Sequence, residues 1–160
     1  MKSQLKSFGC AFCGIGTALK DEGHLRFHLV AAVYVIALSF YYRLSAVKWA
    51  VLLILIALII SAELINSALE RICDLITGEY DLRIKHIKDI SAAAVLVLSF
   101  AAVATAFFFY FDVDKIKSLF LYFFNNPILL ILLIVSIIIS VVFIWAGPTG
   151  IKNFFSKKSA

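Results

Sequence analysis

The stretch WAVLLILIALIISAELINSALERICD, residues 49–74, places polar side chains at the end of an otherwise apolar run. Glu63, Asn66, Glu70 and Asp74 follow one another at spacings of three, four and four residues. At ~100° of rotation per residue, their directions on a helix fall within about 60° of one another. The pattern therefore predicts one long helix that carries a single polar stripe.

The composition indicates a membrane protein. Of the 160 residues, 63% are hydrophobic and the mean hydropathy is +1.01, which is more apolar surface than one soluble domain of this length buries. A helix needs ~20 apolar residues to cross about 30 Å of hydrocarbon. Four segments meet or approach that length, at residues 29–42, 49–69, 91–111 and 128–146. Pro127 and the GPTG at 147–150 are expected to begin and end the fourth span.

Residues 2–20 predict a basic amphipathic helix on the membrane surface, because apolar side chains recur there every three or four positions. The segment lacks a compact apolar core before a cleavage site, so we expect it to remain in the mature chain. With both termini cytoplasmic, only Arg43, Lys48, Lys115 and Lys117 of the 15 Lys and Arg residues lie outside. The positive-inside rule therefore predicts a multi-pass protein of the bacterial inner membrane with both termini in the cytoplasm.

The net charge of +5 is accounted for by cations that face anionic lipid, so we expect no nucleic-acid partner. The three cysteines fall on the cytoplasmic side of this topology, where disulfides are rare. Cys10 and Cys13 form a CxxC pair that would need ligands from His24, His28 or His86 to bind a metal. Reduced thiols that serve as small apolar side chains are the simpler interpretation.

The depth of Glu63 calls for a partner or a function. It lies ~21 Å along a helix that starts at Trp49, where an ionised group costs about 2.5–3.5 kcal/mol on insertion scales. In one interpretation the stripe is structural: its acids pair with Arg71 or Lys88, and Asn66 bonds across a helix interface. In the other interpretation the stripe carries chemistry.

The chemical interpretation groups the cytoplasmic ends of three spans. Glu22 begins the first span, Glu70 lies near the end of the second, and Lys88 with Asp89 begins the third. Two carboxylates and a polyphosphate are a suitable ligand set for Mg²⁺, and a deeper carboxylate can act on a lipid hydroxyl. The glycines of GCAFCGIGTA lack the Lys-Ser/Thr of a P-loop. The residues therefore predict phosphoryl transfer at the membrane interface without a P-loop.

Three motifs in this order resemble a known family. ELINSALERICD (63–74) is similar to E-x-x-N-S/T-A-I/L-E-x-x-x-D, and KHIKDISAAAVL (85–96) is similar to K-x-x-K-D followed by small residues. SFGCAFCGIGTALKDEGHLRFH (7–28) resembles S-F-x-Y-A-x-x-G-I ending in E-x-N-x-R-I/F-H. Together they resemble the prokaryotic diacylglycerol kinase family, small integral-membrane lipid kinases. The R-F-H and K-x-x-K-D forms look more like its Gram-positive branch, which favours undecaprenol.

The resemblance implies a homotrimer with active sites between subunits, in which Mg²⁺ and ATP serve the phosphorylation of a lipid alcohol. It implies that Glu63 is the catalytic base, that Asn66 supports the site, and that Glu22 and Glu70 bind the metal. Cys10 stands where the motif has Tyr, and His24 where it has Asn. The residues that the resemblance assigns to the nucleotide are Cys10, Glu22, Glu70, Glu79, Tyr80, Asp81, Lys88 and Asp89.

We therefore expect an all-α membrane protein with an N-terminal amphipathic surface helix. Residues 1–112 are expected to form a three-span kinase core, and residues 113–160 an outer loop, a fourth C-terminal transmembrane helix and a basic cytoplasmic tail. The expected activity is ATP-dependent phosphorylation of a membrane lipid alcohol, undecaprenol to undecaprenyl phosphate. The alternatives are a diacylglycerol kinase that makes phosphatidic acid and a small proton-coupled carrier. Expected partners are the lipid alcohol, ATP and the surrounding membrane lipids.

Overall fold

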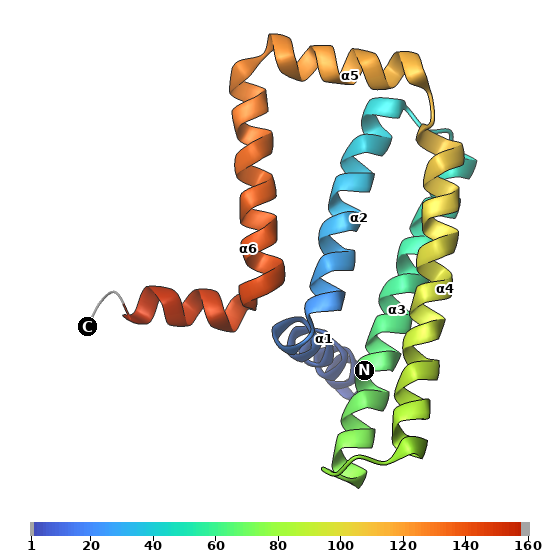
Figure 1. Ribbon diagram of the computed structural model, residues 1–160, viewed down its shortest axis with the longest axis vertical. Helices are drawn as coiled ribbons and strands as arrows, with labels where there is room; N and C mark the ends of the chain where they lie inside the picture. The colour runs from blue at the N-terminus through green and yellow to red at the C-terminus, as the bar shows by residue number, and fades with distance from the viewer. Residues whose placement is uncertain (1, 158–160) are drawn as a thin grey trace.

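The computed structural model describes residues 2–157 as an all-helical protein (Figure 1). Met1 and residues 158–160 lie outside the described part, and with them Lys158, one of the predicted cytoplasmic cations. The helices are α1 (Lys2–Asp21), α2 (Gly23–Tyr42), α3 (Ala46–Ile76), α4 (Leu82–Tyr110), α5 (Val113–Asn125) and α6 (Pro127–Lys157). Four of the described helices, α2, α3, α4 and α6, are long and apolar enough to cross a membrane. The all-α fold with four candidate spans is thus confirmed.

The centre of the fold is the hairpin of α3 and α4, which make the most extensive contact between any two helices described. Ser45 caps the start of α3, and Asp81 caps the start of α4 by accepting a hydrogen bond from the Arg83 backbone N–H at 2.7 Å. On α3 the buried polar side chains are those of Glu63, Asn66 and Ser67. The deeper part of the polar stripe, Glu63 and Asn66, therefore faces other helices rather than lipid.

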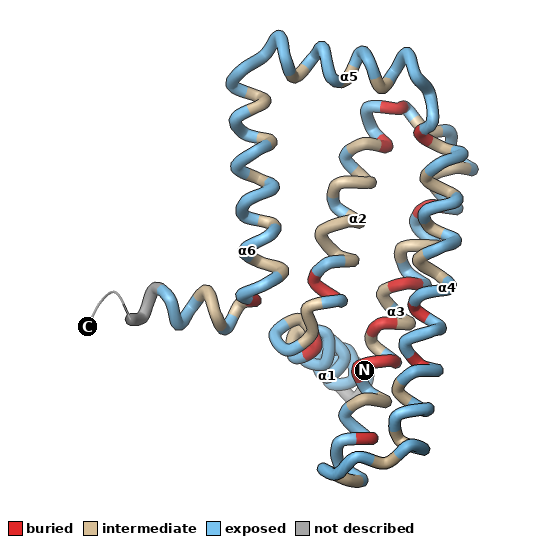
Figure 2. Tube along the Cα trace, viewed as in Figure 1, coloured by how far each residue is buried: buried red, intermediate tan, exposed pale blue. Residues whose placement is uncertain are grey.

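Helix α2 packs against this hairpin, and a small polar cluster joins the C-terminal end of α2 to α4. The Ser39 hydroxyl, fully buried, lies 2.6 Å from the Tyr110 hydroxyl of α4. The Tyr42 hydroxyl donates to the Tyr110 carbonyl at 2.9 Å. Figure 2 shows buried positions gathered along α2, α3 and α4, whereas α5 and nearly all of α6 are intermediate or exposed. Exposed apolar side chains on those helices suit contact with hydrocarbon.

The structure adds helical residues next to the expected spans in three segments. The KHIKD segment is already helical, because α4 begins at Leu82 behind the Asp81 cap. The expected outer loop contains helix α5, whose start is capped by the Asp112 carboxylate accepting from the Lys115 backbone N–H at 3.1 Å. The fourth span ends at GPTG as expected, because the backbone at Gly147 is non-helical, but a further helical stretch continues from this bend to Lys157. In each case local capping or a glycine decided the helix boundary.

Replacing Tyr110 with phenylalanine tests this polar cluster at the C-terminal end of α2. Tyr110→Phe removes the hydroxyl that pairs with Ser39 and should lower the free energy of unfolding by ~1 kcal/mol. Tyr41→Phe is the matched control, because the Tyr41 hydroxyl is exposed and makes only a 3.4 Å bond to the Lys115 carbonyl. Thermal unfolding of the purified proteins in one detergent measures both. Equal melting temperatures for Tyr110→Phe and wild type would show that the cluster adds no stability.

Candidate active site

A polar cleft of about 500 Å³ opens between α2, α3 and α4. It is lined by three of the four stripe residues, Glu63, Asn66 and Glu70, and by Asp89 from α4. The fourth, Asp74, is exposed and pairs with Lys88 across the hairpin. The structural interpretation therefore applies to Asp74, while the other three carry polar groups into a cavity.

Glu63 is the most deeply placed acid of the cleft, with 4% of its surface exposed. One of its carboxylate oxygens, Oε1, lies 3.2 Å from Nε2 of His28 on α2. A buried carboxylate beside an imidazole is held within reach of a proton-transfer partner. Sequence reasoning considered His28 only as a possible ligand of a metal site at Cys10 and Cys13, and its position in the R-F-H segment was the available signal for a role here.

Asn66 links Glu70 of α3 to α4. Its amide nitrogen Nδ2 donates to Glu70 Oε1 at 2.8 Å, and its Oδ1 accepts from the Ser91 hydroxyl at 2.6 Å. Ser91 is buried and also lies 2.9 Å from the Lys88 carbonyl oxygen. In the sequence Ser91 was interpreted only as a small packing residue. The network fixes the Asn66 amide and, through it, one oxygen of Glu70.

Glu22 approaches the cleft from the junction of α1 and α2. Burial raises the pKa of the Glu22 carboxyl above its ordinary value, and the nearby Glu70 carboxylate raises it further. Arg71 opposes this shift; its Nη2 lies 4.0 Å from Glu22 and 2.9 Å from Asp21. Two carboxylates that repel each other at the edge of a polar cleft fit a hard divalent cation such as Mg²⁺.

The remaining predicted site residues lie outside the cleft. Cys10 and Cys13 are exposed free thiols on α1, and within residues 2–157 no three His, Cys, Asp or Glu side chains form a metal cluster. Glu79 and Tyr80 are exposed in the turn between α3 and α4. Hydrogen bonds from Arg83 lower the pKa of Asp81, in the same turn, to about 2. The nucleotide role of these residues therefore stays a prediction.

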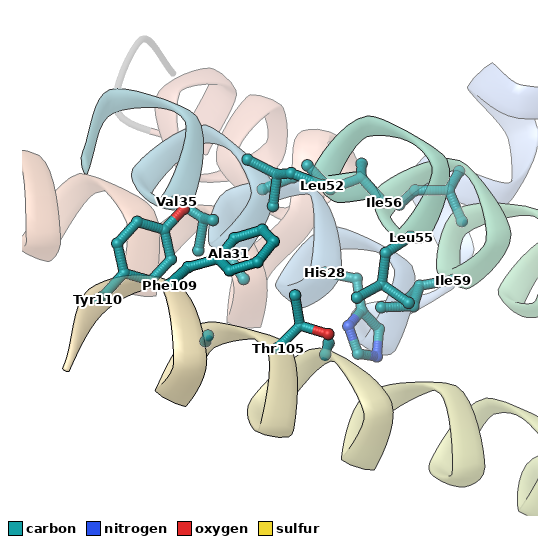
Figure 3. A pocket seen from close by; sticks show the side chains of 14 residues that line it. His28, Ala31, Val35, Leu52, Leu55, Ile56, Ile59, Thr105, Phe109 and Tyr110 are labelled. Carbon is teal, nitrogen blue, oxygen red and sulfur yellow. The ribbon is translucent and has the colours of Figure 1, made fainter. Parts of the chain in front are cut away.

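An apolar cavity of about 110 Å³ lies on the other side of His28. Its walls come from α2, α3 and α4, with His28 and Ile59 at one end and Phe109 and Tyr110 at the other (Figure 3). His28 lines both this cavity and the polar cleft. The site thus has an apolar compartment and a charged compartment that meet beside Glu63.

One buried carboxylate, with further acids at the ends of helices long enough to cross a membrane and an apolar cavity beside it, fits a multi-pass membrane enzyme that works on an amphipathic molecule. Residues 9–110 match the family described as "Prokaryotic diacylglycerol kinase". The chain therefore belongs to this family and is a lipid kinase, as the three motifs predicted. Family membership also implies ATP as co-substrate, and it favours the enzyme over the carrier.

Three relatives illustrate the similarity. The chain is 37% identical over 94 residues to the undecaprenol kinase of Bacillus subtilis, covering 59% of this chain and 76% of that protein. It is 37% identical over 100 residues to a diacylglycerol kinase of Synechocystis, covering 62% and 57%, respectively. It is 29% identical over 101 residues to the diacylglycerol kinase of Escherichia coli, covering 63% and 83%. No solved structure matches the chain.

The raised pKa of Glu22 makes a prediction about stability. The folded chain binds a proton at Glu22 more tightly than the unfolded chain does, so the ionised carboxylate costs stability above its ordinary pKa of 4.5. Without divalent cations, Glu22→Gln should therefore melt at a higher temperature than wild type at pH 7. The difference should vanish as the pH falls below 4.5, where both side chains are neutral.

The control for this experiment is Glu79→Gln, which neutralises an exposed acid in the α3–α4 turn and should leave the melting temperature unchanged. Melting curves recorded in EDTA between pH 4 and pH 7 make the comparison. A melting temperature for Glu22→Gln at or below that of wild type at pH 7 would contradict the conclusion that the ionised Glu22 carboxylate lowers stability.

Proposed function

We propose that the protein phosphorylates undecaprenol to undecaprenyl phosphate at the inner face of the bacterial cell membrane, using ATP and Mg²⁺. The observation that carries this proposal is the position of buried Glu63, where the apolar cavity and the polar cleft meet at His28. A lipid alcohol with the first carbons of its chain in the apolar compartment presents its hydroxyl to Glu63. The phosphates of ATP then occupy the polar side.

Support for undecaprenol comes from the R-F-H and K-x-x-K-D segments and from the undecaprenol kinase of Bacillus subtilis, of which the chain covers 76%. The alternative substrate is diacylglycerol, with phosphatidic acid as product, because a relative named diacylglycerol kinase has the same 37% identity. We further propose cytoplasmic N- and C-termini, a kinase core in residues 1–112 and a homotrimer with active sites between subunits.

In the proposed reaction, the Glu63 carboxylate accepts the proton of the lipid hydroxyl as the lipid oxygen bonds to the γ-phosphorus of ATP. The bond between that phosphorus and the oxygen bridging to the β-phosphate breaks, and ADP leaves. Glu22 and Glu70 would hold Mg²⁺, which neutralises charge on the phosphate oxygens when bound. Positioning and electrostatics supply most of the acceleration in such a transfer.

The other residues of the proposal orient the nucleotide. Asn66 keeps Glu70 turned toward the cleft by the 2.8 Å bond from its amide. Asp89 reaches the cleft from α4, and Lys88 lies one residue away from it. We propose that these two residues contact ATP together with Cys10 on α1 and the turn residues 79–81.

The substrate is tested by supplying undecaprenol and diacylglycerol in parallel to the purified protein in lipid bilayers, with γ-labelled ATP. Thin-layer separation of the products measures each rate. We expect kcat/KM to be about tenfold or more higher for undecaprenol, a barrier difference of ~1.4 kcal/mol. A preference for diacylglycerol would establish the alternative substrate, and labelling of neither lipid would refute both.

The base assignment predicts that Glu63→Gln abolishes turnover. The amide keeps the shape and hydrogen bonding of the carboxylate but cannot take the hydroxyl proton, and losing a general base costs about 10²–10⁴ in rate. ATP binding and folding should be retained, which equilibrium binding and circular dichroism measure. Asp114→Asn on α5, an amide replacement far from the cleft, serves as control. Near wild-type kcat for Glu63→Gln would refute the assignment.

The metal assignment predicts a change in Mg²⁺ dependence. Glu22→Gln and Glu70→Gln should each raise the Mg²⁺ concentration for half-maximal rate on the order of tenfold, since each removes one charged contact. Rates measured from micromolar to millimolar Mg²⁺ at saturating ATP give this value, and Asp114→Asn again serves as control. An unchanged Mg²⁺ dependence in both variants would exclude these acids from the metal site.

A further inference from the structure

Arg26 is a buried cation near the start of α2, with 6% of its surface exposed. Within residues 2–157 no ion pair joins it to a carboxylate. Its guanidinium instead donates to three backbone carbonyls. Nη1 donates to Leu19 and Lys20 of α1, each at 3.0 Å, and Nε donates to Ile144 of α6, also at 3.0 Å. One side chain of α2 therefore holds two other helices.

The α1 carbonyls belong to the last turn of that helix, which ends at Asp21. The last four carbonyls of a helix have no partner within it, and the helix dipole places negative charge there. A guanidinium satisfies both needs, because it brings positive charge and several N–H donors in one plane. Arg26 thus acts as the C-terminal cap of α1.

The Ile144 carbonyl lacks its helical partner for a different reason. In a regular helix it would accept from the N–H four residues later, but that residue is Pro148, which has none. Gly147 beside it has a φ of 62°, in the left-handed region, and is buried. A Cβ at Gly147 would lie 2.9 Å from Nη1 of Arg26. The bend of α6 therefore frees a carbonyl and leaves space for the guanidinium.

We propose that Arg26 is a positioning residue that ties α6 to the active site. Glu22, a proposed metal ligand, lies one helical turn before Arg26, and its carbonyl accepts from the Arg26 backbone N–H at 3.4 Å. His28, beside Glu63, lies two residues after it. By joining the end of α1, the start of α2 and the bend of α6, Arg26 sets where Glu22 stands relative to Glu70. This inference rests on the proposed kinase function.

A second contact between α2 and α6 offers a matched control. The Tyr34 hydroxyl lies 3.0 Å from the Ser136 hydroxyl and 3.1 Å from that of Ser140, two turns or more from Arg26. Changing both serines to alanine loosens α6 on α2 without touching the guanidinium. If general packing of α6 were responsible, this control would behave like the Arg26 variants.

The test uses Arg26→Lys, which keeps the charge but loses the planar fork, and Gly147→Ala, which pushes on the guanidinium from α6. Gly147→Ala also covers the case in which Arg26→Lys fails to fold. In lipid bilayers each should raise the Mg²⁺ concentration for half-maximal rate about fivefold, while KM for the lipid stays within about twofold. Amide hydrogen exchange in residues 17–22 should become about tenfold faster. The Ser136→Ala, Ser140→Ala control should change neither quantity.

The double variant Arg26→Lys, Gly147→Ala should change the Mg²⁺ dependence and the exchange rate no more than the stronger single variant does. Both substitutions disrupt the same contact, which the Arg26 guanidinium makes with α1 and α6. Unchanged amide hydrogen exchange in both single variants would refute the contact of Arg26 with α1 and α6. Faster exchange with unchanged Mg²⁺ dependence would refute the positioning role and leave a purely structural contact. If the wild-type protein phosphorylates neither lipid, the proposed function fails. The hydrogen-exchange measurements alone then test whether Arg26 holds α1 and α6 together.

Discussion

The constraint on which the structure depends is the enclosure of the Glu63 carboxylate, an acid at hydrocarbon depth. An ionisable group on a lipid-facing surface would be costly, so the helices must turn it inward. Helix α4 makes this possible, because Ser91 in its first half is a small buried residue whose hydroxyl donates to Asn66 of α3. The helix pair then forms the wall of the cleft, and α2 completes it with His28.

The same enclosure separates two environments within one site. The apolar cavity is lined almost entirely by apolar side chains, whereas the cleft is lined by the acids Glu63, Glu70 and Asp89. Within residues 2–157, His28 is the one residue that lines both, and it lies 3.2 Å from Glu63. A kinase that takes its alcohol from the bilayer and its phosphate from water needs such a boundary, because the two substrates have opposite solubility.

Helix ends carry much of the polar organisation of the protein. Asp81 and Asp112 cap helix starts. Arg26 donates to carbonyls that lack a helical partner, at the end of α1 and at the bend of α6. Within a membrane a backbone group without a partner is expensive, so each helix end needs a donor or an acceptor from the chain itself. This requirement gives α6 a defined contact with α2 although most of its surface remains exposed.

The sequence by itself determined the spans, the polar stripe, the N-terminal helix and the family, because these follow from local periodicity, composition and motif spacing. In one interpretation it also paired the acids of the stripe with Arg71 or Lys88, and the structure pairs Asp74 with Lys88. It predicted that GPTG ends the fourth span, where α6 bends at Gly147, but it predicted neither helix α5 nor the helical stretch after that bend. Only the tertiary structure placed His28 beside Glu63, Ser91 on Asn66 and Arg26 on Ile144, the last two pairs separated by 25 and 118 residues. Such pairs depend on how each helix is rotated against its neighbours, and side-chain packing over the whole bundle fixes that rotation.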